Sequence, residues 1–262
     1  MRPKLGVNAH MVRILVAILV LLFCPAAWAG QVVHVGGYDF PPFVEDSAGH
    51  AHGLALDMIA ALNKAQTEYE FQFVPTTARR RYADLSEGRI DAIFFESPEW
   101  DWAEKGYKVD FSNVFLRGGE VFIALKKPGR GQEWFADLKG KRIVGILGYH
   151  YGFAGFNSDP DWLARTWNMK LVTNHKSSID MVLADRMDVA IVTDAYLNAF
   201  LNANAEAAER LLVSNRYDQL YSHRAVVRRG GPIEVGTVNR LLADMERDGT
   251  LPRLWREAGI NR

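Results

Sequence analysis

Residues 85–96 read LSEGRIDAIFFE, and this stretch decides the fold class. The residues before Gly88 end a short helix predicted for 79–87, and glycine suits the left-handed backbone that closes a helix. Residues 90–95 are almost continuously apolar, which is typical of a strand covered by helices on both faces. The stretch therefore predicts a helix that passes directly into a buried parallel strand, as in a β–α–β unit.

The residues before this stretch predict the rest of that unit. Residues 32–36 alternate and are rich in β-branched side chains, so they predict a first strand, and 69–74 predict a second. Between them, apolar residues recur at helical spacing from Gly53 to Ala65. Strands and helices alternate here, which favours a parallel sheet.

A second stretch, DRMDVAIVTD at 185–194, echoes the first. It also passes from the predicted end of a helix, 177–185, into a buried strand, 189–192, and a further helix is predicted for 194–204. Residues 142–147 supply the other strand of this round. The echo predicts two lobes of similar plan.

Two extended apolar segments, 120–126 and 220–228, flank the second round. They predict a pair of strands that cross between the lobes, and such a double hinge permits closure around a ligand. The fold class is therefore α/β, with two Rossmann-like lobes joined by a two-strand hinge. We expect lobe 1 to comprise residues 30–123 plus 221–262, and lobe 2 to comprise 124–220.

The N-terminus has the pattern of a secretory signal peptide. Basic residues precede an apolar run at 14–23, and Ala27-Trp28-Ala29 offers small residues at the two positions that a signal peptidase reads. Ten apolar residues are about half of the ~20 needed to span a bilayer. We expect residues 1–29 to be removed and the protein to be periplasmic, whether translation starts at Met1 or at Met11.

The single cysteine, Cys24, lies inside the segment to be removed. Phe23 before it is too large for a lipidation site, so no covalent membrane anchor is expected. Removal of three basic residues leaves 31 − 3 = 28 basic against 31 acidic residues. This mildly acidic balance argues against a nucleic-acid partner.

Seven short motifs then occur in one order along nearly the whole remaining chain. From about residue 32 to 260 they resemble the family 3 extracellular solute-binding proteins. The motifs are GYDFPPF at 37–43, GLALDM at 53–58, LSEGRIDA at 85–92, DFS at 110–112, DLKGKRIVG at 137–145, DVAIVTD at 188–194 and MERDGT at 245–250.

This resemblance implies a type II periplasmic binding protein fold and a solute receptor of an ABC importer. Such a receptor binds a small polar solute between its lobes, here an amine-bearing one such as an amino acid, and presents it to a membrane permease. It implies a monomer with no cofactor and no metal.

The candidate site follows from the strand ends. In open α/β sheets, ligands bind beyond the carboxyl ends of the strands. Tyr38, Glu96, Tyr149 and Asp194 each follow such an end. The resemblance implies that Asp194 accepts hydrogen bonds from a ligand ammonium, and the same residue is placed to cap the helix that it begins.

Other candidates surround these four. By resemblance, Ser97 and His150 belong to loops that present polar groups to the ligand, and Trp100 suits an aromatic wall around a cation. The amino-acid binders carry an arginine just before the Phe-Ser motif, where it grips the ligand carboxylate, but residues 100–105 contain none. Lys105 or Arg80 is a candidate replacement, although only one or two of the three adjacent arginines 79–81 can face inward.

Enzyme motifs are absent from the sequence. It contains no Gly-x-Ser-x-Gly elbow, no phosphate-binding Gly-Lys-Ser/Thr loop and no His-Glu-x-x-His helix, and its seven histidines lack metal-ligand spacing. Two alternatives stay open. One is a dehydratase of the same fold acting on prephenate-like acids, with Glu96, Asp194 and His150 as acid and base, and the other is a stand-alone sensory module.

Overall fold

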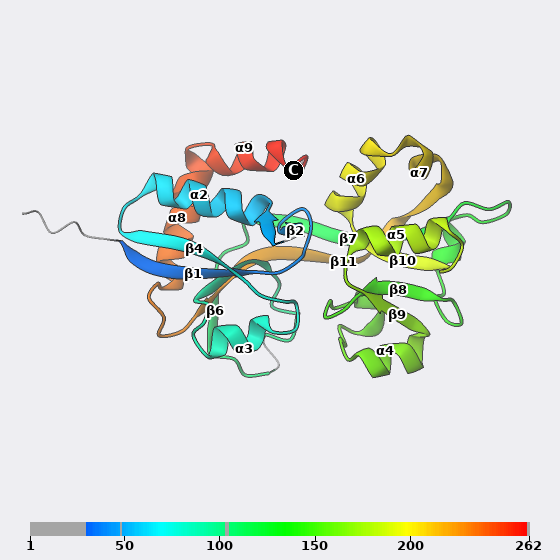
Figure 1. Cartoon of the computed structure of the whole chain (residues 1–262), viewed down its shortest axis with the longest axis horizontal. Helices are drawn as coiled ribbons and strands as arrows, with labels where there is room; N and C mark the ends of the chain where they lie inside the picture. The colour runs from blue at the N-terminus through cyan, green and yellow to red at the C-terminus, as the bar shows by residue number, and fades with distance from the viewer. Residues whose placement is uncertain (1–29, 48, 103–104, 261–262) are drawn as a thin grey trace, which may run out of the picture.

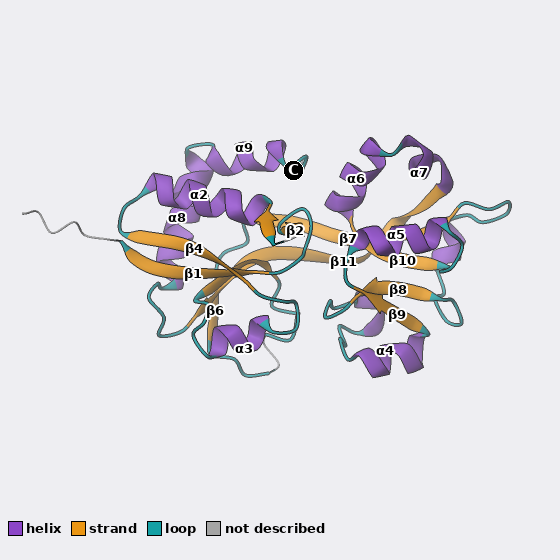
Figure 2. Ribbon diagram, viewed as in Figure 1, coloured by secondary structure: helices purple, strands orange, loops and turns teal. Residues whose placement is uncertain are grey.

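The computed structural model describes residues 30–47, 49–102 and 105–260. The predicted signal peptide, residues 1–29, lies outside the described residues. Figures 1 and 2 show two lobes side by side, each with helices against strands, joined by two long strands, β7 and β11. The prediction of two α/β lobes with a two-strand hinge is confirmed.

One mixed sheet of nine strands runs through both lobes. Eight strands follow one another in space and the ninth, β6 (Val109–Phe111), pairs with β11. The spatial order is β4 (Tyr69–Pro75), β1 (Gln31–Gly37), β5 (Ala92–Glu96), β11 (Leu211–Arg228), β7 (Leu116–Leu125), β10 (Val189–Thr193), β8 (Ile143–Ile146) and β9 (Met169–Val172).

The strands within each lobe are parallel, whereas the two crossing strands run antiparallel to their neighbours. β1 pairs in parallel with β4 and β5, and β8 pairs in parallel with β9 and β10. β11 is antiparallel to both β5 and β7, and β7 is antiparallel to β10. The carboxyl ends of the parallel strands therefore face the junction between the lobes, where a ligand is expected.

Helices cover the sheet in both lobes, and a short hairpin precedes the first helix. Lobe 1 contains α2 (Leu54–Ala65), α3 (Arg81–Ser86), α8 (Val235–Arg247), α9 (Thr250–Glu257) and the hairpin β2 (Glu45–Ser47) and β3 (His50–His52). Lobe 2 contains α4 (Pro160–Trp167), α5 (His175–Leu183), α6 (Asp194–Ala203), α7 (Ala205–Arg210) and the 3₁₀ turns η1 (Gln132–Phe135) and η2 (Gly152–Ala154). None of the helices in the described part of the chain is long and apolar enough to cross a membrane.

Gly53 positions the start of α2 against the loop that follows β1. Its φ is 114°, and an added Cβ would lie 2.9 Å from the carbonyl oxygens of Pro42 and Phe43. Only glycine adopts this backbone without strain at such a close approach. The Pro-Pro-Phe and Gly motifs therefore work together, because the second allows the first to pack at the lobe junction.

Two predicted elements differ from the structure. The helix expected at 79–87 begins only at Arg81, because the N–H groups of Arg80 and Arg81 both bond back to the carbonyl of Thr77 in a preceding turn. The extended segment expected at 220–228 begins at Leu211, and two irregularities near Tyr217 allow this long strand to continue along β7.

Candidate functional site

A pocket of about 390 Å³ opens where the parallel strands of the two lobes end. Its walls include Tyr38 after β1, Thr76 after β4, Leu147 after β8 and Thr173 after β9. These residues are far apart in the sequence, and the topology brings them to one place. The position is where the fold class predicts a ligand.

Deeper between the lobes lies a much smaller cavity of about 10 Å³. This volume accommodates about one water molecule. A solute can reach this depth only after the lobes separate, which is the motion that a two-strand hinge allows. The lining residues are Tyr38, Phe40, Arg81, Trp100, Glu120, Gly148, Tyr149, His150 and Gln219.

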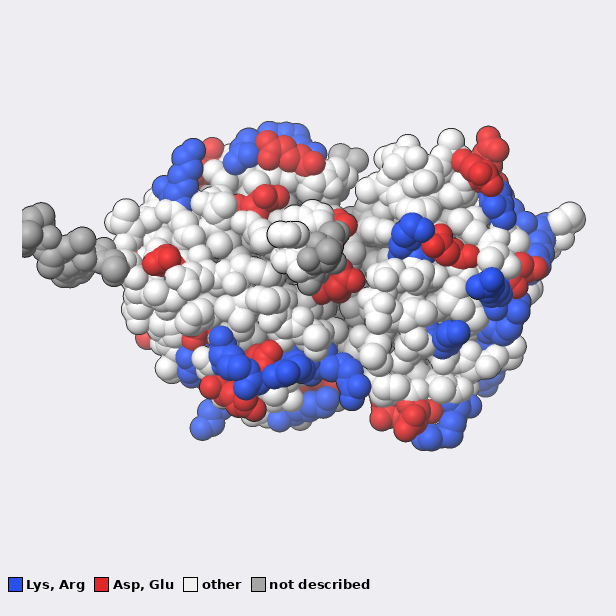
Figure 3. Space-filling view, in the orientation of Figure 1, with Lys and Arg blue, Asp and Glu red and all other residues white. Residues whose placement is uncertain are grey.

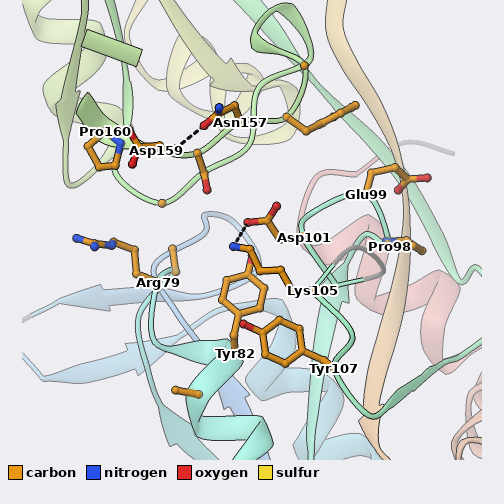
Figure 4. Close-up of a pocket in the computed structure, with 16 residues that line it drawn as sticks. Arg79, Tyr82, Pro98, Glu99, Asp101, Lys105, Tyr107, Asn157, Asp159 and Pro160 are labelled. Atoms are coloured by element: carbon orange, nitrogen blue, oxygen red, sulfur yellow. Dashed lines mark hydrogen bonds and ion pairs between the residues drawn. The ribbon is translucent and has the colours of Figure 1, made fainter. Parts of the chain in front are cut away.

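A third, wider pocket of about 900 Å³ lies between the segment around Asp101 and the loop before α4 (Figure 4). On one wall, the Nζ of Lys105 lies 2.5 Å from Asp101, beside the rings of Tyr82 and Tyr107. The opposite wall carries Asn157 and Asp159. Charged side chains of both signs line this pocket, which is open to solvent at the edge of the junction between the lobes.

Four of the predicted site residues line the deep cavity together: Tyr38, Trp100, Tyr149 and His150. Two of them hold the lobes together directly. The Tyr149 hydroxyl donates to the Asp39 carbonyl at 2.8 Å, and His150 Nε2 lies 3.1 Å from Asp101 Oδ2. Each contact joins lobe 2 to lobe 1, so these side chains respond directly to closure.

Trp100 docks on the hinge instead. Its indole N–H donates to Gln219 Oε1 at 3.0 Å, and Gln219 Nε2 donates to Glu120 Oε2 at 2.9 Å. The same amide group also donates to the His150 carbonyl. Gln219 therefore links both lobes and both crossing strands through one buried side chain.

The structure places Arg80 away from the cleft. Its side chain is 67% exposed and pairs with Asp84 one helical turn later. The next residue, Arg81, faces inward instead, with a side chain only 1% exposed. The inward-facing arginine is therefore Arg81 and not the predicted Arg80.

Glu96 and Ser97 are buried, but they face partners within lobe 1. Glu96 lies 3.1 Å from the Arg81 guanidinium and accepts the Trp102 indole N–H at 2.6 Å. The Ser97 hydroxyl donates to Glu99. Phe95, just before them, has a φ of 63°, an uncommon conformation for a bulky residue that turns the chain at the end of β5.

Asp194 begins α6 directly after β10. Its Oδ1 accepts the N–H of the next residue, Ala195, at 2.7 Å, but Thr193 is the residue that precedes the helix and no side chain caps it, so the predicted capping role of Asp194 is not observed. Burial raises the pKa of Asp194 above its usual value. The residue pairing places the preceding Thr193 opposite Glu120 of β7, which brings Asp194 close to the hinge.

Glu120 and Gln219 belong to the cavity and were not among the predicted site residues. Both are buried, and they are paired in register on β7 and β11. Burial first, and then the charges of Asp218 and Asp194, raise the pKa of Glu120 well above its usual value. Glu120 lies in the middle of β7, and its place at the cavity follows from the pairing of β7 with β10 and β11, so no local sequence signal could have found it.

His150 is the histidine among the residues that line the deep cavity. Burial lowers the pKa of His150 to about 4, so this imidazole is neutral at pH 7. Within the described ranges, no group of three or more histidine, cysteine or carboxylate side chains could hold a metal ion.

Comparison with known proteins agrees with this geometry. The family model described as bacterial extracellular solute-binding proteins, family 3, matches residues 33–257. The chain belongs to this family. The match covers both lobes and the crossing strands, so membership rests on the whole described fold.

The L-cystine-binding protein TcyJ of Escherichia coli strain K12 is 26% identical over 228 residues, covering 82% of this chain and 77% of that protein. A substrate-binding protein of a Streptococcus pneumoniae ABC uptake transporter, solved with bound histidine, matches with a TM-score of 0.68 and 20% identity, covering 86% and 91% of the chains. An ancestral arginine-binding protein bound to arginine matches with a TM-score of 0.66 and 22% identity, covering 87% and 98%.

Proposed function

We propose that this family 3 member is a periplasmic receptor that binds a small polar, amine-bearing solute between its lobes and delivers it to an ABC importer. The observation that supports this most directly is the interlobe cavity, whose walls come from both lobes and from both crossing strands. Ligand binding there would favour the closed state, and a permease would recognise that shape.

The proposal includes the parts of the chain that support such a role. Lobe 1 comprises residues 30–123 plus 221–262, lobe 2 comprises 124–220, and residues 1–29 direct export and are removed. The mature protein acts as a monomer, without a lipid anchor. The proposed ligand contacts are Tyr38, Trp100, Tyr149, His150 and Asp194, while Arg81 faces inward in place of Arg80 but is held by Glu96.

The first test is a search for a bound solute. Native mass spectrometry of the protein, gently purified from the periplasm of expressing cells, is expected to show a discrete small-molecule adduct. A thermal-shift screen would follow with L-cystine, L-histidine, L-arginine, L-lysine and simple diamines. Binding of none of these, together with an adduct-free protein, would contradict the receptor proposal.

We also propose binding without turnover. Incubation with prephenate and related acids, followed by product analysis, is expected to show no reaction above the buffer control. Measurable dehydration would establish the enzyme alternative.

Asp194→Asn tests the predicted ammonium contact. A hydrogen bond to a charged group contributes about 1.5–3 kcal/mol, so affinity for the best ligand of the screen should fall by roughly 10- to 100-fold. The asparagine oxygen can still accept the Ala195 N–H, so folding should be retained. Isothermal titration calorimetry measures the change, and an unaltered Kd would remove Asp194 from the site.

A further inference from the structure

The buried cation of the cleft already has a carboxylate partner from its own lobe. Arg81 Nε lies 3.1 and 3.2 Å from the two oxygens of Glu96, and neither side chain is exposed by more than 1%. The guanidinium also lies over the rings of Tyr38 and Tyr82, at 4.8 and 4.3 Å from their centres. Glu96 thus holds Arg81 in the way that a ligand carboxylate would.

The pair is electrically neutral, and its surroundings fix it in place. Trp102 donates its indole N–H to Glu96, and the Arg81 guanidinium donates to the Ala78 carbonyl. A ligand carboxylate arriving beside this pair would gain no net charge compensation, and it would lose its hydration on burial. Desolvation of an uncompensated charge costs several kcal/mol.

The other basic groups near the cavity do not take the place of Arg81 as partners for a ligand carboxylate. Lys105 is engaged by Asp101, and His150 is neutral because burial lowers its pKa. Arg79 lines the two outer pockets, whereas Arg80 faces solvent.

One acidic side chain, Glu120, lines the deep cavity, and a second, Asp194, follows the residue paired with it. Glu120 is 2% exposed and accepts a hydrogen bond only from the neutral amide of Gln219 among the contacts described. Burial raises the pKa of both carboxyls, and for Glu120 the neighbouring acids add to the effect. A cation bound here would relieve that unfavourable environment.

The remaining walls suit a cation with an apolar stem. The rings of Tyr38, Phe40 and Tyr149 lie together, with centres 5.5 to 6.4 Å apart. Aromatic faces attract ammonium groups by about 0.5–2 kcal/mol and also cover methylene groups. Figure 3 shows both acidic and basic side chains at the visible surface where the two lobes meet, so only the buried groups distinguish the sign of the ligand charge.

We propose that the cleft selects an amine without a carboxylate, such as a short diamine, with Glu120 and Asp194 as the ammonium acceptors and Glu96 as the group that excludes a ligand carboxylate. This inference rests on the proposed receptor function and specifies its substrate class. It adds Glu120 and Glu96 as specificity-determining residues.

The test compares two ligands that differ only by the carboxylate. Cadaverine (1,5-diaminopentane) is L-lysine without its carboxyl group, and calorimetric titration of the purified protein is expected to show at least 10-fold tighter binding of cadaverine. If L-lysine binds equally well or better, or if another amino acid binds while cadaverine does not, the inference is overturned and the receptor function stands. Binding of no probe would overturn both.

Variants separate the two specificity roles. Glu120→Gln, which removes the negative charge and keeps the side-chain shape, should weaken cadaverine binding at least 10-fold, whereas Glu206→Gln on the exposed surface of α7 should not change it. Glu96→Gln releases Arg81 and should shift the lysine-to-cadaverine preference towards lysine by 10-fold or more. Thermal unfolding of each variant verifies folding, and an unchanged preference in a folded Glu96→Gln protein would contradict the role of Glu96.

Discussion

Replacement of Arg81 by alanine is expected to lower the free energy of unfolding by about 3–5 kcal/mol, the usual loss when one partner of a buried ion pair is removed. The cause lies with the residue left behind. Glu96 is fully buried, and without Arg81 its charge would be stabilised mainly by the Trp102 indole N–H. Urea denaturation at pH 7 measures the change.

The neighbouring residue provides a matched control. Arg80→Ala makes the same substitution one position earlier, on a side chain that is 67% exposed. Exposed ion pairs contribute about 0–1 kcal/mol, so this variant should unfold almost like the parent protein. Equal losses for the two variants would show that Arg81 is not the buried partner of Glu96.

Two further measurements identify why Arg81→Ala loses stability. In Arg81→Ala, protonation of Glu96 would remove the unpaired charge. The difference in free energy of unfolding from the parent protein should therefore become smaller as the pH falls from 7 towards 5. The double variant Arg81→Met with Glu96→Gln should recover much of the lost stability, because neutral groups of similar size replace both charges. A loss that is independent of pH would indicate lost packing instead of an unpaired carboxylate.

The fold could be predicted from the sequence because its signals are local. The buried strands at 90–95 and 189–192 are runs of apolar residues between helix signals, and each became a central strand, β5 and β10. The segment 160–172 was missed, although Asp159 followed by Pro160 is a typical helix start and the structure places α4 there. Its helix spans only eight residues and buries only Leu163, so it offered too short a pattern to be noticed.

The site was less predictable because it depends on side-chain direction. Tyr38, Trp100, Tyr149 and His150, named from their position after strand ends or beside them, line one cavity in the structure, and their role as ligand contacts stays a prediction. Arg80 was named among the three adjacent arginines 79–81, whereas the structure turns Arg81 inward, and the sequence pattern alone does not fix which of the three side chains does so. Glu120 depends on the pairing of β7 with β10 and β11, which no local pattern reveals.

Acid stability is expected to depend strongly on the buried histidines, and His223 offers the sharpest case. Its ring is fully buried among the rings of Phe43, Phe95 and Tyr221. Burial lowers the pKa of His223 to about 3, against a smaller opposing effect of the Phe95 backbone. The folded protein therefore keeps this imidazole neutral where the unfolded chain, with a pKa near 6.5, would bind a proton.

Proton linkage fixes the direction in which the free energy of unfolding changes with pH. Between about pH 6.5 and 3 the unfolded state binds more protons at this site, so stability falls as the pH falls, by up to about 1.4 kcal/mol per pH unit. Asp218 acts in the opposite direction over a narrower window, because burial raises its pKa to about 6 and the folded state holds the extra proton. His175, with a pKa lowered to about 3 by burial, adds to the acid sensitivity.

His223→Phe removes one of these groups and keeps an aromatic ring in the same cluster. Relative to the parent protein, its free energy of unfolding should improve by about 3 kcal/mol between pH 7.5 and pH 4, since about 2.5 pH units of proton linkage are removed. His52→Phe makes the same substitution at an exposed position and is the control for the introduced ring. Urea titrations at several pH values provide the measurement, and parallel profiles for His223→Phe and the parent would show that His223 does not stay neutral in the folded state. The His223 ring also packs against Phe40 and Trp100 at the lobe junction. If the free energy of unfolding of His223→Phe depends less on pH than that of the parent protein, an acid-sensitive group of the fold lies beside the proposed ligand cleft.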